Sequence, residues 1–179
     1  MLWLGHLALG YLVSKVVISI FSIPISPDQV DSLILIGMIA SVLPDVDLVP
    51  FFLRHKSFKI QKDKSHRRVW SHAPLLWAII IVIIATFLSS TFMLMASLVF
   101  LAGSLSHFLA DSIEYGVFWL WPFSSRKVFI REAKGNGYSP QEHSALQHYK
   151  HFLKNVYIKN WTMKAEIIIL IIALFVFLN

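Results

Sequence analysis

The fold is decided by residues 74–110, which read PLLWAIIIVIIATFLSSTFMLMASLVFLAGSLSHFLA. Two apolar runs, Pro74 to Leu88 and Phe92 to Ala110, are separated only by the short uncharged connection Ser89-Ser90-Thr91. Runs of this length approach the roughly 20 apolar residues that a helix needs to cross a bilayer core of about 30 Å. A connection this short joins antiparallel neighbours. The stretch therefore predicts a helical hairpin at residues 74–110 with its turn at one membrane face.

The composition extends this interpretation to the whole chain. Its 179 residues are 56% hydrophobic and only 15% charged, and the mean hydropathy is +0.66. These values lie outside the usual range of soluble proteins. Further apolar segments run from Leu2 to Phe21, from Ser32 to Leu53 and from Met163 to Leu178. We expect an all-α, polytopic membrane protein with about five transmembrane or partly inserted helices.

We expect residues 1–179 to form a single membrane-embedded domain. Its parts are a motif region over 6–123, a loop and helix over 124–162, and a last transmembrane helix over 163–178. The start of the chain carries no Lys or Arg, and no small-residue cleavage pattern follows it. We therefore expect the first segment to be a retained helix, not a removable signal peptide.

Basic residues are concentrated in two connections. Residues 54–68 hold seven Lys or Arg against one acid, Asp63, and residues 126–164 hold eight more of the sixteen. The positive-inside rule then predicts that both loops and the N-terminus are cytoplasmic, and that the hairpin turn and the C-terminus are outside. Because the basic charge lies beside the membrane, anionic lipid is a simpler partner than nucleic acid.

Ionisable residues gather at the predicted cytoplasmic end of the apolar segments. At 1.5 Å per residue, Asp45 lies about 21 Å beyond Asp31, and His107 lies about 24 Å beyond Thr91. Such groups are costly in a bilayer, so their default interpretation is a functional site. The absence of Cys leaves His and carboxylates as the strong metal ligands. The residues concerned are His6, Asp45, Asp47, His66, His72, His107 and Asp111.

The first two motifs that contain these ionisable residues each have two interpretations. His107 and Asp111 stand at i, i+4 on one helical face, so they either share a metal ion or form a structural contact. In Leu43-Pro44-Asp45-Val46-Asp47, the proline ends a helical run. An extended segment there would present both acids on one face, or the acids would cap the next helix.

The remaining motifs are also open to two interpretations. His66-Arg67-Arg68 is either a basic loop that contacts lipid head groups or a site for bidentate phosphate binding. His6 alone is either a ligand or an interfacial side chain with its polar tip in water. Ser139-Pro140-Gln141-Glu142 predicts a helix start. The face that follows, with His143 and His151, is either a third ligand patch or a solvated surface.

The order of these motifs resembles the YdjM-type family of inner-membrane, metal-dependent hydrolases. The resemblance runs from His6 to Phe123 and implies a multi-pass protein of the bacterial inner membrane. Arg68 departs from the family's usual glycine, and Ser71-His72-Ala73 replaces its commoner Thr-His-Ser. The matching motifs are His6 with Gly10, Leu43-Pro44-Asp45-Val46-Asp47, His66-Arg67 with Ser71-His72, Gly103 with Ser106-His107 and Asp111, and Gly116 with Leu120-Trp121-Pro122-Phe123.

The order of ligands is also similar, more distantly, to that of zinc-dependent phospholipase C and related nucleases. That likeness implies that Asp111 bridges two metal ions and that His6 binds one of them. Asp45, His107 and either His72 or His66 would bind the other, and Asp47 would orient a ligand or replace one. We therefore predict zinc, with manganese or iron as alternatives, on His6, Asp45, His72, His107 and Asp111. We assign Asp47, His66 and Arg67 to catalysis.

The leading hypothesis is a membrane-embedded metallohydrolase that directs metal-activated water at a phospholipid or another amphiphilic phosphoester. One alternative is a non-enzymatic scaffold or regulatory protein that contacts anionic lipid. Another is a metal or proton transporter, which the clustering of ionisable groups at one face disfavours.

Overall fold

The structure is a computed structural model that describes residues 1–21, 25–55, 70–114, 116–128, 130, 147 and 150–179. Within these residues there is no β-strand, only an isolated bridge between Val117 and Val128, so the predicted all-α fold is confirmed. The elements are α1 (Trp3–Phe21), α2 (Pro27–Val42), the 3₁₀ turn η1 (Leu43–Asp47), α3 (Leu48–His55), the 3₁₀ turn η3 (Trp70–His72), α4 (Pro74–Thr86), α5 (Thr91–Glu114), the π-helical turn η4 (Phe152–Tyr157) and α7 (Trp161–Leu178).

Four of the described helical segments are long and apolar enough to cross a membrane: Trp3–Phe21, Pro27–Pro50, Thr91–Ile113 and Trp161–Leu178. The apolar helix α4 has only 13 residues, or about 20 Å at 1.5 Å per residue. It is therefore too short to span a 30 Å core alone. The described chain is a helical membrane protein, as expected.

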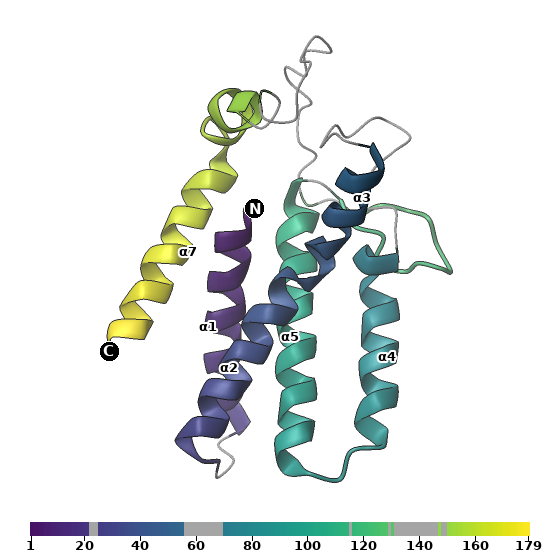
Figure 1. The fold of residues 1–179 in the computed structure, drawn as a ribbon, viewed down its shortest axis with the longest axis vertical. Helices are drawn as coiled ribbons and strands as arrows, with labels where there is room; N and C mark the ends of the chain where they lie inside the picture. Colours follow the sequence, from purple (N-terminus) through teal and green to yellow (C-terminus); the bar gives the residue numbers. More distant parts are fainter. Residues whose placement is uncertain (22–24, 56–69, 115, 129, 131–146, 148–149) are drawn as a thin grey trace.

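Helices α1, α2 and α5 pack against one another, while α4 packs on α5 and α7 packs on α1 (Figure 1). The hairpin predicted for residues 74–110 is present, because α4 and α5 run antiparallel and meet at a turn over residues 87–90. Helix α1 begins at the end of the bundle opposite the hairpin turn, and α7 ends part-way along the bundle (Figure 1).

Helix α2 begins five residues earlier than the predicted segment, which started at Ser32. A capping box causes this: Gln29 N donates to Ser26 Oγ over 3.4 Å, and Ser26 N donates to Gln29 Oε1 over 3.1 Å. Pro27 occupies the first helical position, where its fixed φ suits a helix. Residues 27–31, which lay outside the predicted apolar segment, therefore belong to the helix.

The segment around Pro44 does not adopt the extended conformation that was one of its two interpretations. Leu43–Asp47 forms the 3₁₀ turn η1, which leads directly into α3. With three residues per turn, side chains two positions apart point in different directions. Asp45 and Asp47 therefore do not share a face, whereas an extended segment would have placed them on one face, and they reach different partners.

Residues spaced by four along α1, α2 and α5 connect an apolar core to a polar cluster. Leu33, Met95 and Val99 form the buried core, which lies towards the hairpin turn. From this core toward the end of the bundle where α1 begins, each helix next presents a glycine and then its ionisable residues. The three rows are His6, Gly10 and Ser14 on α1, Leu33, Gly37, Ser41 and Asp45 on α2 and η1, and Met95, Val99, Gly103, His107 and Asp111 on α5.

The glycines bring the three helix backbones into close contact. A Cβ atom on Gly103 would lie 2.5 Å from the carbonyl oxygen of Gly37, and one on Gly10 would lie 2.6 Å from the same oxygen. No side chain fits there, so the carbonyl of Gly37 lies directly against both neighbouring helices. This crossing fixes the separation of the helix ends that carry the ionisable residues.

Candidate metal centre

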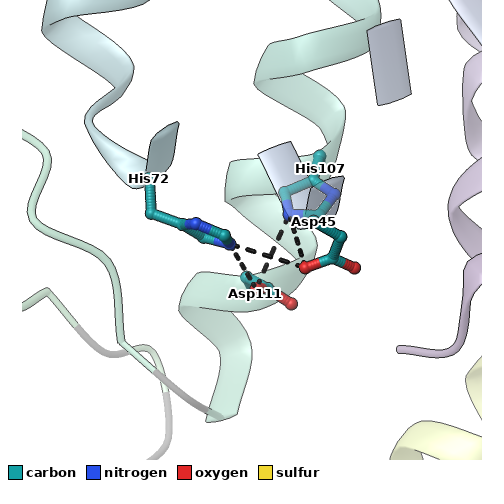
Figure 2. A group of neighbouring side chains, drawn as sticks. All are labelled: Asp45, His72, His107 and Asp111. Carbon is teal, nitrogen blue, oxygen red and sulfur yellow. Dashed lines mark ion pairs between the residues drawn. The ribbon is translucent and has the colours of Figure 1, made fainter. Parts of the chain in front are cut away.

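Four side chains from three separate segments point toward one another at the end of the bundle where α1 begins (Figure 2). They are Asp45 of η1, His72 of η3, and His107 and Asp111 of α5, and all four are buried. One ligand atom from each lies within 4.8 Å of the other three. The structure thus brings together four of the five predicted ligands.

Four ion-pair separations within the group join a histidine nitrogen to a carboxylate oxygen. His72 Nε2 lies 3.5 Å from Asp45 Oδ1 and 3.9 Å from Asp111 Oδ2. His107 Nε2 lies 3.8 Å from Asp45 Oδ1 and 3.7 Å from Asp111 Oδ2. These distances exceed those of N–H···O hydrogen bonds, which cluster near 2.9 Å. The four atoms surround a common centre without bonding directly to each other.

The orientation of His107 is set by the backbone of α2. Its Nδ1 lies 2.8 Å from the carbonyl oxygen of Ser41. A carbonyl only accepts, so Nδ1 carries the hydrogen, and in the neutral ring Nε2 presents a lone pair. That lone pair faces two carboxylate oxygens, and among the described residues Nε2 makes no hydrogen bond. A buried acceptor that faces other acceptors requires a cation or a proton between them.

His72 is oriented in the same way, by a carboxylate. Its Nδ1 lies 3.2 Å from Asp47 Oδ2, and the same oxygen accepts a hydrogen bond from Ser71 Oγ over 2.6 Å. Trp77 Nε1 donates to the Ser71 carbonyl over 2.9 Å and so fixes the η3 backbone. Histidines that bind metals almost always donate their second nitrogen to a carboxylate or a carbonyl. Both histidines of the group meet that condition.

The group fits a divalent metal in geometry and in charge. With bonds of 2.0–2.2 Å, a tetrahedral zinc site has ligand-to-ligand edges of about 3.3–3.6 Å. The observed edges of 3.5–3.9 Å between nitrogen and oxygen are close to this range. Two ionised carboxylates beside two neutral imidazoles carry a charge of −2, which a divalent cation balances. Without a cation, two buried carboxylates this close together repel each other.

His6, the fifth predicted ligand, lies beside the group. Its Nε2 is 3.8 Å from Asp111 Oδ1, the oxygen opposite the one that faces His72 and His107. The His6 ring stacks on His107 with the centroids 4.1 Å apart and an interplanar angle of 27°. The two oxygens of Asp111 thus face different histidines.

The other predicted site residues have different positions. Asp47 lies behind His72 and does not face the centre of the group. His66 and Arg67 lie outside the described residues, as do His143 and His148. His151 is described, and its Nδ1 lies 3.2 Å from Asn155 Nδ2, apart from the group of four.

The sequence interpretation missed Glu166, a buried carboxylate of α7. It accepts hydrogen bonds from Leu2 N over 3.0 Å and from Gly5 N over 3.1 Å, and Tyr157 Oη donates to it. A carboxylate at a helix N-terminus satisfies unpaired backbone N–H groups and complements the helix dipole. Glu166 thereby attaches α7 to the turn of α1 that carries His6. The available signal was the one acid, Glu166, in the apolar terminal segment that begins at Met163.

Comparison with known proteins identifies one family. The family model described as YdjM inner membrane protein matches residues 1–179. No curated protein and no solved structure matches the chain.

Proposed function

The chain belongs to the YdjM inner membrane protein family, and we propose that it is a membrane-embedded, metal-dependent hydrolase. Its metal ligands are Asp45, His72, His107 and Asp111, with His6 at the edge of the site. The substrate is a phospholipid or another amphiphilic phosphoester, and the site faces the cytoplasm.

The observation that carries the proposal is the convergence of buried acceptors. The Nε2 lone pair of His107 faces two carboxylate oxygens, while its Nδ1 is committed to the Ser41 carbonyl. A purely structural His–carboxylate contact would turn an N–H toward the acid at hydrogen-bond distance. The arrangement instead matches that of a metal site in which a hydrogen bond to the second ring nitrogen orients each histidine ligand.

A bound divalent metal would lower the pKa of its water toward about 7 and supply hydroxide at neutral pH. Zinc suits a mixed set of imidazole and carboxylate ligands, and manganese and iron are alternatives. The chain's own contribution is to position this set. Ser41 and Asp47 hold the two imidazoles, and Asp111 presents one oxygen to each side.

The membrane location favours an amphiphilic substrate. The cluster lies at one end of the apolar helices, where a head group can reach it while the acyl chains stay in the bilayer. Arg67, proposed on the sequence alone, would pair with the substrate phosphate. The basic loops and the N-terminus are proposed to lie on the cytoplasmic side of the inner membrane.

One observation favours a second candidate, a structural metal clamp in a non-enzymatic membrane protein. Four protein ligands complete a tetrahedral zinc site, and structural zinc sites are closed in this way. A hydrolase needs an open position for water, which requires five-fold coordination or the release of one ligand. The presence of a water ligand on the metal therefore separates the two candidates.

The test begins with the metal content of the detergent-purified chain, measured by elemental analysis. The variants His107→Gln and Asp111→Asn are compared with His151→Gln, which removes a histidine outside the group. We expect near-stoichiometric zinc, manganese or iron in the wild type and in His151→Gln, and at least about tenfold less in the two site variants. Monodisperse elution in size-exclusion chromatography shows that each variant is folded.

Turnover and coordination complete the test. The metal-loaded chain is assayed against a phosphatidic acid and a soluble phosphodiester, and X-ray absorption gives the number of ligands. Hydrolysis that the site variants lose, together with an added water ligand, supports the hydrolase. Four-coordinate metal with no turnover supports the structural clamp. No metal after reconstitution in a folded chain contradicts both.

A further inference from the structure

The connection after α5 is attached to the helix that carries Asp111. Gly116 N donates to the Asp111 carbonyl over 3.2 Å, and Ile130 N donates to the Ser112 carbonyl over 2.8 Å. Trp119 Nε1 donates to Ser112 Oγ over 2.8 Å. We name residues 116–128 the interfacial loop. Its first residue, Gly116, and Ile130, two residues beyond its last, are thus held within one residue of Asp111.

The interfacial loop also contacts the hairpin partner of α5. Leu75 N, in the first turn of α4, donates to the Trp119 carbonyl over 3.3 Å. In Figure 1 the loop, coloured green, lies beside the end of α4 farthest from the hairpin turn. At 24 residues, α5 is about 36 Å long, which exceeds a 30 Å hydrocarbon core. A loop that begins directly after it therefore lies at the membrane boundary.

Large apolar side chains of this loop are exposed. Phe123 is 82% exposed and Leu120 is 58% exposed, and the neighbouring Ile130 is 71% exposed. In water such exposure is unfavourable, whereas side chains of this kind insert readily at a bilayer interface. Trp121, also exposed, is a residue type enriched at that depth.

Leu120 also lines a basic hollow of about 410 Å³. Its described lining is Leu120, Ser124, Arg126, Lys127 and Val128, which includes two cations, one hydroxyl and no carboxylate. Ser124 Oγ accepts from Arg126 N over 3.2 Å, which fixes the local backbone. Lys127 Nζ lies 5.2 Å from the centroid of the Phe118 ring, so its ammonium is held close to the loop.

We propose that this hollow binds the phosphate of an anionic phospholipid, with Arg126 and Lys127 as the binding cations and Leu120 and Phe123 against the acyl chains. A guanidinium and an ammonium beside a hydroxyl match a phosphate in charge and in hydrogen bonding. The apolar rim favours a lipid over free phosphate. This binding site does not depend on bound metal, but it would retain substrate beside the metal centre if the proposed hydrolase function holds.

Native mass spectrometry of the full chain in detergent tests the site. Dioctanoyl phosphatidylglycerol is titrated in parallel with dioctanoyl phosphatidylcholine and with inorganic phosphate. The variant R126Q/K127Q is compared with K154Q/K159Q, which removes two exposed lysines elsewhere and so matches the change in charge. The variant R126K/K127R keeps both charges and controls for folding.

We expect the wild type to bind phosphatidylglycerol in preference to phosphatidylcholine. R126Q/K127Q should weaken that binding at least about tenfold, while K154Q/K159Q and R126K/K127R retain it. An equal loss in K154Q/K159Q would overturn the site in favour of general charge attraction. Equal binding of phosphatidylcholine would overturn it in favour of apolar contact, and displacement of the lipid by equimolar inorganic phosphate would identify a free-anion site.

The same titration on metal-free His107→Gln separates this proposal from the hydrolase. Lipid binding that persists in that variant supports the hollow whether or not the chain hydrolyses anything. Turnover by a wild type that shows no lipid preference would support the hydrolase and overturn the hollow.

Discussion

Asp47 Oδ2 lies 3.2 Å from Nδ1 of His72, while the opposite nitrogen of that ring, Nε2, lies 3.5 Å from Asp45 Oδ1. The two acids of one 3₁₀ turn therefore contact the two sides of a single imidazole. Asp45 faces the candidate metal position, whereas Asp47 faces away from it. Asp47 is thus a positioning residue for His72.

Removal of Asp47 tests this relationship. Asp47→Ala should lower metal affinity by about 10–100-fold, because His72 loses the partner that fixes its tautomer and ring orientation. Asp31→Ala, an exposed acid on α2, is the matched control and should leave affinity unchanged. Competition with a metal-binding dye measures both. If Asp47→Ala bound metal as tightly as the control, the role assigned to Asp47 would be wrong.

Metal removal should destabilise the wild type. A ligand present at 100 times its Kd contributes about 2.7 kcal/mol to the free energy of unfolding, so a chelator should lower Tm. The Tm of Asp111→Asn should hardly change on addition of chelator. In chelator, the Tm of this variant should be higher than that of the wild type, because the repulsion between residue 111 and Asp45 is relieved. Tryptophan fluorescence during heating measures both. Identical chelator responses would contradict the predicted site.

The helix crossing predicts a sharp steric effect. Gly37→Ala places a methyl group against Ser14 of α1 and Val99 of α5, and overpacking of this kind costs about 1–3 kcal/mol. Ile39→Ala, which truncates a half-exposed side chain two residues further along, should cost less. The measurement is the fraction of each variant that stays monodisperse after heating in detergent. Equal losses would argue against close packing at Gly37.

The Glu166 contact predicts a link between α7 and α1. Glu166→Ala leaves the amides of Leu2 and Gly5 without their acceptor, at a cost of about 1–3 kcal/mol. Tyr157→Phe removes only the hydroxyl donor and should cost less. In the double variant the two losses should not add, because both groups share one carboxylate. Thermal unfolding of the four proteins measures the coupling, and full additivity would refute it.

The predicted topology can be tested directly because the chain contains no Cys. In intact cells, Ser90→Cys in the hairpin turn should react with a membrane-impermeant maleimide. Lys154→Cys should react only after the cells are permeabilised. The reverse pattern would invert the orientation, and equal labelling of both variants would contradict a membrane-spanning arrangement.

The sequence allowed much of the site to be predicted because its ligands follow simple rules. His107 and Asp111 stand one turn apart on a helix whose apolar length is unmistakable, and their side chains do face each other, 3.7 Å apart. Asp45 and His72 flank apolar segments at the same end, so the topology brought them together. The spacing of four also continues through Gly103 and Gly37, so the sequence contains the signal for the close helix crossing as well.

Other features of the site and of the fold could not be predicted from the sequence. The division of roles between Asp45 and Asp47 depends on the 3₁₀ geometry of η1, which a proline in the sequence does not specify. The contact of Glu166 with Gly5 joins residues 161 positions apart, and no periodicity predicts such a pairing. Zinc, hydrolysis and the assignments of His66 and Arg67 stay predictions.

The four side chains of the candidate metal centre come from distant positions in the sequence, and this constrains the order of events during biosynthesis. Asp45, His72, His107 and Asp111 are separated by up to 66 residues of chain. During synthesis the last of them is added only after α1, α2 and α4 have been synthesised, so a nascent chain that ends before α5 lacks half of the group. An ion bound by the proposed site would therefore meet its complete ligand set only after α5 has been synthesised, which would make metal loading a late step in the biogenesis of this protein.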